Sequence, residues 1–191
     1  MKTIILASAS PRRKELLEKI GLKFEVEPSH YEEDISSKLE PHELAKALSL
    51  EKAKVVAKNH KNALVIAADT FIVFKGKILG KPQTETEAKK MLETINGKAH
   101  SVITGFTIID TENNQALSKS VETKVYLRRL TPDEIDAYVK SKEPLDKAGA
   151  YAIQRLGSVI VDKIEGDYFN VIGLPLSALV ESLKEFGVHV L

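Results

Sequence analysis

The sequence contains no cysteine, which excludes disulfides, thiol nucleophiles and thiolate metal sites. Neither sign of charge is in excess, because 28 Lys and Arg residues face 27 Asp and Glu residues. The chain therefore has no overall field that would attract a nucleic acid. No apolar run approaches the length of a membrane span, and the first residues do not follow the pattern of a signal peptide. These absences predict a cytoplasmic protein with no membrane partner and no stable nucleic-acid partner.

Several catalytic signatures are missing as well. The five histidines are scattered without ligand spacing, which argues against a histidine metal site or a catalytic triad. Neither GxGxxG nor GxSxG occurs. Residues 76–82, GKILGKP, are one residue short of a P-loop and carry proline where the magnesium-binding Ser or Thr belongs. The chemistry that remains must use carboxylates, lysines and arginines.

The residues that are present indicate one ordinary globular domain over 1–191. Hydrophobic residues make up 43% of the chain and charged residues 29%, as in many soluble folds. Periodicity and capping signals predict helices near 11–20, 41–59, 84–95, 131–141 and 174–187. Strands are expected near 3–7, 23–27, 63–68, 71–74, 99–109, 116–128 and 151–164. This alternation predicts an α/β fold with a mixed, strongly bent sheet and flanking helices.

The first predicted helix carries its arginines at an unusual end. Ser10 is placed as the N-cap and Pro11 as the first helical residue, so Arg12 and Arg13 fall in the first turn. Cations are unfavourable there, because the helix dipole is positive and unpaired N–H groups point outward. A bound anion would make the arrangement favourable. The alternative is that both arginines are solvated surface residues.

Other charged residues stand at the ends of predicted elements. Asp69 is expected at the C-terminal end of the apolar strand 63–68, where open α/β sheets usually bind ligands. Lys52 lies on a predicted helix, and Lys81 lies between Gly80 and Pro82, which restrict its backbone. Taken singly, each residue suits a surface or turn role. Together with the acidic residues Glu32, Glu33 and Asp34 of a predicted loop, they supply carboxylates for a hard divalent cation and cations for a polyphosphate.

The combination and order of these segments resemble the Maf family of nucleotide pyrophosphatases over essentially the whole chain. The matching stretches are SASPRRKELL (8–17), EE (32–33), EKA (51–53), ADT (68–70), GKP (80–82), EPLDKAGAYAIQ (143–154), GDY (166–168) and VIGLPL (171–176). The resemblance implies a fold of two lobes around a deep cleft, shared with inosine triphosphate pyrophosphatases. It also implies hydrolysis of a nucleoside triphosphate to the monophosphate and pyrophosphate.

The resemblance assigns expected roles to residues of this chain. Asp69 is the expected general base and, with Glu33, the expected holder of a Mg²⁺ or Mn²⁺ ion, and Glu32 is a further candidate for holding it. The phosphates are expected to contact five residues, which are Ser8, Arg12, Arg13, Lys52 and Lys81. A homodimer is left open.

Arg12, Thr70 and Gln154 match the branch of the family that prefers dTTP and UTP, together with modified pyrimidine nucleotides. The Gln154 amide offers one donor and one acceptor for the O4/N3–H edge of uracil or thymine. Such an enzyme would prevent incorporation of non-canonical nucleotides. Two alternatives remain: a 7-methyl-GTP pyrophosphatase, and a non-catalytic nucleotide- or DNA-binding regulator, since the family is associated with arrest of septum formation in cell division.

Overall fold

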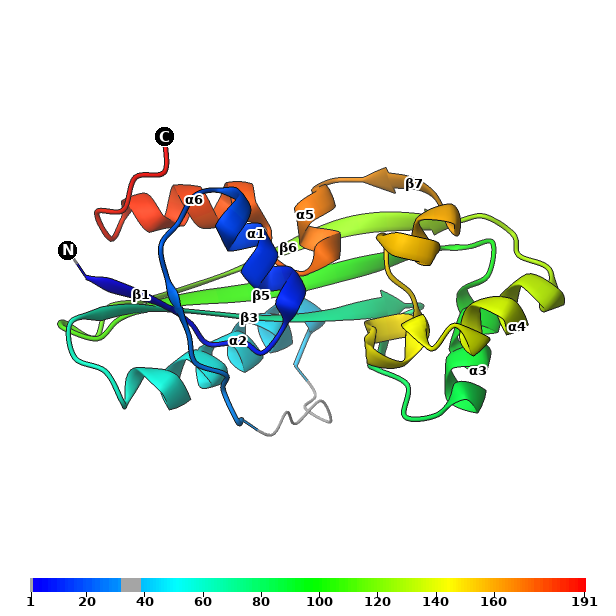
Figure 1. Cartoon of the computed structure of the whole chain (residues 1–191), viewed down its shortest axis with the longest axis horizontal. Coiled ribbons are helices and arrows are strands. Elements are labelled where there is room, and N and C mark those ends of the chain that lie inside the picture. Colours follow the sequence, from blue (N-terminus) through cyan, green and yellow to red (C-terminus); the bar gives the residue numbers. More distant parts are fainter. Residues whose placement is uncertain (1, 32–38) are drawn as a thin grey trace. The chain divides into compact units, whose positions relative to one another are not determined.

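The computed structural model describes residues 2–31 and 39–191. Strands and helices are interspersed along the chain (Figure 1). The strands are β1 (Thr3–Leu6), β2 (Glu25–Val26), β3 (Ala63–Phe74), β4 (Lys77–Leu79), β5 (Ala99–Asp110), β6 (Ala116–Leu127) and β7 (Val161–Glu165). The α-helices are α1 (Pro11–Lys19), α2 (Pro41–Ala57), α3 (Glu85–Ile95), α4 (Pro132–Lys140), α5 (Tyr168–Ile172) and α6 (Leu176–Lys184). The described residues also form short 3-10 helices, which are η1 (Glu143–Asp146), η2 (Ala148–Ala150) and η3 (Arg155–Val159).

The strands of the described residues form one seven-stranded sheet in the order β2-β1-β3-β5-β6-β7, with β4 paired to β3. β1 is parallel to both β2 and β3, whereas the β3–β4 and β6–β7 pairs are antiparallel. The predicted mixed α/β class is therefore confirmed. Within residues 2–31 and 39–191, no helix combines the length and apolarity needed to cross a membrane.

The prediction that Asp69 ends a strand is wrong, because β3 runs without interruption from Ala63 to Phe74. β1 pairs with only the first part of β3, from Thr3↔Ala63 to Leu6↔Ile66. The Ala7 amide adds one further bond of 2.7 Å to the Ile66 carbonyl. Asp69 therefore lies inside a strand but three residues beyond its parallel pairing, so this carboxylate still follows the end of β1.

The predicted strand over 151–164 is also wrong for most of its length, because only Val161–Glu165 is extended as β7. Residues 155–159 form the turn η3 instead. Arg155, and Ala150 directly before the predicted strand, adopt left-handed backbone angles, with φ of 55° and 63°. Such angles break a strand and are uncommon for residues other than glycine. The short helix α5 and the shortness of β2 were not expected either.

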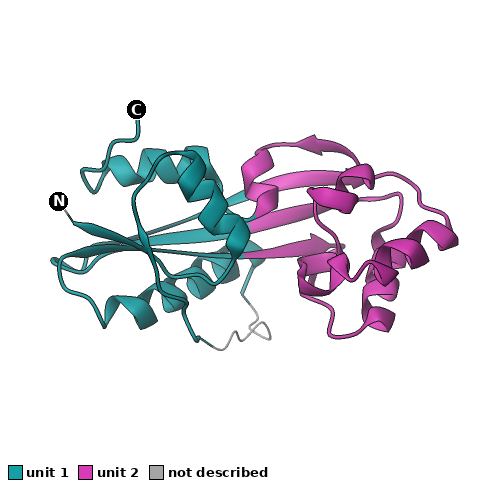
Figure 2. Ribbon diagram, in the orientation of Figure 1, with its two compact units in different colours: residues 1–69, 104–121, 173–191 teal, residues 70–103, 122–172 magenta. Residues whose placement is uncertain are grey.

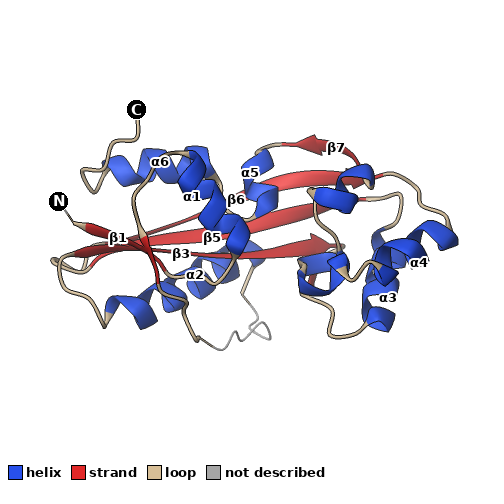
Figure 3. Cartoon of the chain, viewed as in Figure 1, coloured by secondary structure: helices blue, strands red, loops and turns tan. Residues whose placement is uncertain are grey.

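The chain divides into two compact units (Figure 2). Unit 1 comprises residues 1–69, 104–121 and 173–191, and unit 2 comprises residues 70–103 and 122–172. In unit 1, α2 lies on one side of the sheet, and α1 and α6 lie on the other (Figure 3). Residues 63–69 of β3 are accordingly buried throughout. The single domain over 1–191 and the cleft stay predictions.

Helix α2 packs against β5 through matched small and polar residues. A Cβ at Gly105 would lie 2.1 Å from the Ala45 carbonyl oxygen, so only glycine allows this approach. Two residues further along β5, Thr107 Oγ1 hydrogen-bonds to Ser49 Oγ at 2.7 Å. Four helical residues rise about 6 Å and two strand residues about 6.6 Å, so positions 45 and 49 stay in step with 105 and 107. These contacts fix the distance between α2 and the sheet and the position of α2 along β5.

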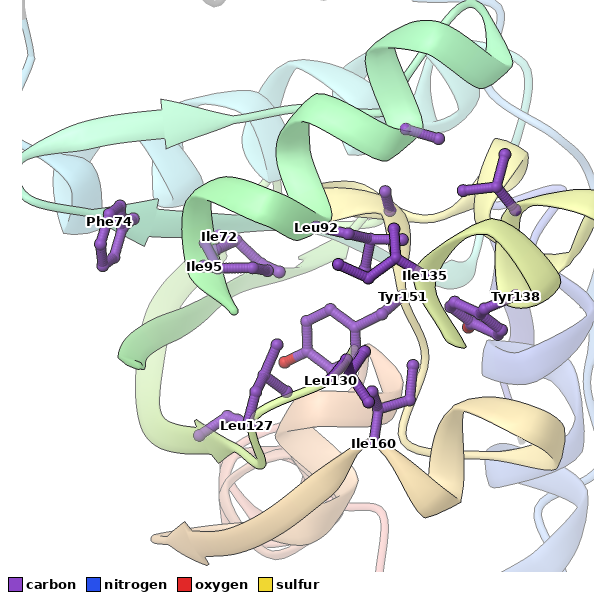
Figure 4. Packing of buried hydrophobic residues seen from close by; sticks show 14 of the residues in the cluster. Ile72, Phe74, Leu92, Ile95, Leu127, Leu130, Ile135, Tyr138, Tyr151 and Ile160 are labelled. Atoms are coloured by element: carbon purple, nitrogen blue, oxygen red, sulfur yellow. The ribbon is translucent and has the colours of Figure 1, made fainter. Parts of the chain in front are cut away.

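Unit 2 has its own apolar core (Figure 4). Ile72 and Phe74 of β3 contribute to it, as do Leu92 and Ile95 of α3. Tyr151 lies within this cluster and is almost fully buried. The core therefore fixes the chain three residues before Gln154.

Candidate active site

Lys52 and Asp69 form an ion pair inside unit 1, with Nζ of the lysine against Oδ1 of the aspartate. The exposed fractions of the two residues are only 9% and 6%. An ionised side chain is rarely buried to this extent unless it is paired. The predicted base and one predicted phosphate contact are thus direct neighbours, and Lys52 is not an ordinary surface lysine.

The meeting of these two residues follows from strand and helix periodicity. Ala63, Val65 and Ala67 of β3 belong to the apolar cluster that also holds Ala53 and Val56 of α2. Side chains alternate along a strand, so Asp69 continues the face that looks toward α2. Lys52 directly precedes Ala53 in α2. The carboxylate and the ammonium are therefore aligned by the packing of their apolar neighbours.

A second contact joins Ser8 and Arg13, also inside unit 1. Ser8 Oγ accepts hydrogen bonds from Arg13 Nη1 at 3.1 Å and from the Ser10 amide at 3.3 Å. Arg13 Nε donates to the Gly173 carbonyl at 2.8 Å, which ties α1 to the segment that leads into α6. Ser8 keeps its own O–H as a donor, because a hydroxyl accepts two bonds and donates one.

Helix α1 begins at the residue that the sequence analysis predicted. The helix begins at Pro11, so Arg12 and Arg13 do lie in its first turn. The N-cap residue, Ser10, makes no side-chain capping bond within the described part of the chain, and the first turn lacks an acidic residue. The helix dipole and the first N–H groups are thus not compensated by a carboxylate in that turn. Arg12 is half-buried.

Three of the predicted residues, Thr70, Lys81 and Gln154, belong to unit 2. Lys81 is exposed and follows Gly80, whose carbonyl accepts a 2.9 Å bond from the Gly149 amide. A Cβ at Gly149 would lie 2.3 Å from Cδ1 of Ile72, and its φ is +66°. Glycine is therefore required at 149, where the segment 146–151 joins the segment that carries Lys81.

Gln154 is half-buried and directly precedes η3. Thr70 follows Asp69 in β3 and is half-buried, with its side chain on the opposite face of the strand by alternation. Glu32 and Glu33 lie outside the described residues, so their predicted metal role stays a prediction. Among residues 2–31 and 39–191, no three His, Cys, Asp or Glu side chains gather as a metal cluster.

The sequence analysis missed a buried histidine and a carboxylate that accepts several bonds. His100 is 3% exposed, and its Nε2 shares a 2.6 Å hydrogen bond with Tyr151 Oη. Burial lowers the pKa of His100 to about 4 and raises the pKa of Tyr151. Glu143 accepts bonds from Tyr138 and from two backbone amides. Glu143 belongs to the stretch EPLDKAGAYAIQ (143–154), but no local sequence pattern predicted its hydrogen-bond partners.

Unit 2 also has a hollow of about 270 Å³, which is lined mainly by apolar side chains. Leu130, Tyr138, Leu156, Val159 and Ile160 contribute to it. The predicted site residues of the described chain do not line this hollow. The charged site chemistry therefore lies elsewhere.

Comparison with known proteins gives full-length matches. The model of the family described as Maf-like protein matches residues 3–186. A protein of Bacillus cereus named dTTP/UTP pyrophosphatase is 49% identical over 190 residues, covering 100% of this chain and 93% of the relative. A Bacillus anthracis protein of the same name is 48% identical over 190 residues, covering 100% and 98%.

Two solved structures show a distant likeness. The nucleoside-triphosphatase, or dITP/XTP pyrophosphatase, of Mycobacterium abscessus is 11% identical, with a TM-score of 0.43 and coverage of 97% of both chains. The Ham1 protein of Staphylococcus aureus is 13% identical, with a TM-score of 0.46 and coverage of 66% of this chain and 72% of that chain.

Proposed function

Because this chain belongs to the family of Maf-like proteins, we propose that it is a nucleotide pyrophosphatase that hydrolyses dTTP and UTP to the monophosphate and pyrophosphate. The structural observation that carries the proposal is the buried Lys52–Asp69 ion pair, which sets a carboxylate beside a cation in unit 1. The full-length relatives named dTTP/UTP pyrophosphatase support the choice of substrate.

Asp69 is the proposed general base. Its carboxylate takes a proton from a water molecule, the water oxygen forms a bond to the α-phosphorus, and the bond from that phosphorus to the bridging oxygen breaks. Pyrophosphate leaves with the electron pair of the broken bond. Lys52 holds the Asp69 carboxylate in place through the ion pair. A base that is held in position avoids part of the entropic cost of the reaction.

The cationic residues are the proposed phosphate contacts. Arg12 and the first N–H groups of α1 form an anion site, to which Ser8 adds a hydroxyl donor. Arg13 has a second role, because its bonds to Ser8 and Gly173 orient the start of α1. Lys52 and Lys81 complete the set. Such groups stabilise the charge that develops on a leaving pyrophosphate.

Asp69 and Glu33, the latter outside the described residues, are the proposed holders of a divalent cation. Mg²⁺ is usually held by one or two carboxylates together with substrate phosphates, so it requires no large cluster of protein ligands. When bound, Mg²⁺ or Mn²⁺ would supply charge neutralisation at the phosphates.

Base selection is assigned to Gln154, with Arg12 and Thr70 as the further residues that match the dTTP/UTP branch. An amide that hydrogen-bonds uracil or thymine leaves polar groups unpaired when cytosine enters, so it discriminates strongly. The role in excluding non-canonical nucleotides follows from the same chemistry, because modified pyrimidines that keep the O4/N3–H edge would be accepted.

The test is a screen of pyrophosphate release with Mg²⁺ or Mn²⁺ across dTTP, UTP, CTP, ATP, GTP and 7-methyl-GTP. We expect kcat/KM to be highest for dTTP and UTP. Preference for 7-methyl-GTP would assign the chain to that activity instead. Nucleotide binding without any pyrophosphate release would support the regulatory alternative and contradict an enzyme.

A further inference from the structure

The loop that carries Gln154, residues 152–157 (the Gln154 loop), is closed on itself. A Cβ at Gly157 would lie 2.0 Å from the Ala152 carbonyl oxygen, so the two ends of the loop touch and only glycine fits at 157. Within the loop, Gln154 is extended and Arg155 is left-handed, with φ of 55°. The backbone therefore turns directly after Gln154.

Two side chains outside the loop hold both of its ends. Glu143 Oε1 accepts a bond of 3.0 Å from the Gly157 amide, and Oε2 accepts one of 3.3 Å from the Leu156 amide. Tyr138 Oη accepts a 3.3 Å bond from the Ala152 amide at the other end. The Tyr138 hydroxyl also donates to Glu143 Oε1 at 3.0 Å, which connects the two ends through one network.

The network is built to stay fixed. Tyr138 is buried in the core of unit 2, and burial together with Glu143 raises its pKa, so the hydroxyl keeps its proton. The backbone of Glu143 is anchored as well: its amide donates to Ser141 Oγ at 3.2 Å, and its carbonyl accepts a bond of 3.2 Å from Lys147 Nζ. A carboxylate that accepts several N–H and O–H bonds is a rigid support.

The Gln154 side chain has a different status from its backbone. Within the described residues, no hydrogen bond or ion pair holds its amide, although the loop around it is held at Ala152, Leu156 and Gly157. The protein thus fixes where the side chain starts and leaves its donor and acceptor for a ligand. A recognition group gains specificity when its support is pre-organised.

We propose that Glu143, acting with Tyr138, is a positioning residue for base selection that sets the Gln154 loop in its reading position. This inference rests on the proposed function. Glu143 itself touches neither base nor phosphate in this proposal. Its removal should therefore reduce discrimination among bases more than it reduces turnover.

The test compares Glu143→Gln, Glu143→Ala and Tyr138→Phe with the unaltered protein. We expect Glu143→Gln to lower the ratio of kcat/KM for dTTP to that for CTP about tenfold, since bonds to a charged group are among the stronger ones. The loss should appear mainly in KM for dTTP. Glu143→Ala should lose more, because glutamine keeps one acceptor oxygen. Amide hydrogen exchange of Leu156 and Gly157 should become faster in both variants.

Glu134→Gln is the matched control. Glu134 also lies in unit 2 and accepts a 2.9 Å bond from Arg128 and a 2.8 Å bond from the Thr131 amide, but it bonds to no residue of the Gln154 loop. It should leave the dTTP-to-CTP ratio unchanged. Tyr138→Phe removes the hydrogen bond from the Ala152 amide without changing Glu143. If the Glu143 variants do not fold, the dTTP-to-CTP ratio of Tyr138→Phe tests the positioning role.

The outcomes separate the two proposals. If the unaltered protein shows no preference for dTTP or UTP, the proposed function fails whatever the variants do. If that preference is present but Glu143→Gln leaves the ratio unchanged, or lowers kcat/KM equally for every nucleotide, the positioning role is overturned.

Discussion

Asp69 and Asp110 are both buried aspartates of unit 1, and each is paired with a lysine. Asp69 pairs with Lys52 of α2, and Asp110, at the end of β5, pairs with Lys2 at 2.5 Å. The two carboxylates thus share burial and pairing but differ in position, because only Asp69 lies beyond the end of β1. A comparison between them separates catalysis from structural support.

Asp69→Asn should lower kcat for dTTP by about 10²–10⁴, because the carboxamide keeps the shape of the side chain but cannot take a proton. Asp110→Asn is the control: it removes the charge of a paired, buried aspartate and should lower stability while leaving kcat within a few-fold. The measurement is steady-state pyrophosphate release with an unfolding curve for each protein. Near-normal turnover of a folded Asp69→Asn protein would contradict its role as the base.

Lys52→Met should destabilise unit 1 by about 3–5 kcal/mol, because it removes the cation that pairs with a buried carboxylate. The double variant Lys52→Met/Asp69→Asn should recover much of this loss, since no buried charge then remains. Urea unfolding of the four proteins gives the coupling free energy. If the loss in the double variant equals the sum of the two single losses, the two residues do not couple and the ion pair contributes little.

Lys81→Ala should raise KM for dTTP with little change in the unfolding midpoint, because Lys81 is exposed. Removing a charge-assisted phosphate contact costs about 1.5–3 kcal/mol, which corresponds to roughly ten- to a hundredfold in binding. Lys77→Ala, at an exposed lysine of β4, is the matched control. Equal kinetics for the two variants would return Lys81 to the role of a surface charge.

Gln154→Glu should reduce the preference for dTTP and UTP over CTP, because a carboxylate cannot donate to the O4 atom of uracil or thymine. The values to compare are kcat/KM for each nucleotide on both proteins. An unchanged ranking of substrates would exclude Gln154 from base recognition.

Stability should fall as the pH is lowered from about 6.5 to about 4, in part through His100. The pKa of this histidine is about 4 in the folded protein, because burial disfavours its charged form, against an ordinary value of 6.5. Between these values the unfolded chain binds more protons, so acidification favours unfolding. The full effect is on the order of 3 kcal/mol.

His100→Gln should make the difference in unfolding free energy between pH 7 and pH 4 smaller by this amount. The same substitution at His189, which is exposed, is the control. If His100→Gln keeps the full pH dependence of the unaltered protein, the buried histidine is not its source.

Local signals in the sequence predicted several elements well. The helices predicted near 84–95 and 131–141 are α3 and α4: Thr84 caps α3 through the Glu87 amide, and Thr131 and Glu134 form a capping box at the start of α4. The extended segment predicted near 71–74 is the end of β3, and Lys75 and Gly76, both with positive φ, form a two-residue turn into β4. These features depend on neighbours within four residues, so the sequence contains what decides them.

Features that depend on distant partners were not predictable in this way. The continuous apolar run ends at Ala68, so Asp69 was interpreted as the end of a strand. The strand continues because Lys52, seventeen residues earlier, compensates the buried charge. Similarly, the apolar residues after Tyr151 suggested a strand, whereas Glu143 supplies the acceptors that fold them into a turn. The charged residues of the site were found from their order, but their contacts required the fold.

The close packing of α2 on Gly105 affects how a substitution at this position would appear in an activity assay. The space for a methyl group is already taken by the backbone of Ala45, so any larger residue must push the helix outward. Lys52 lies on the same helix, about two turns after Ala45. A substitution at 105 would thus present itself in an assay as a catalytic defect, although position 105 touches no reacting group. The absence of a side chain at Gly105 therefore determines where Lys52, about two turns along α2 from Ala45, places its ammonium group.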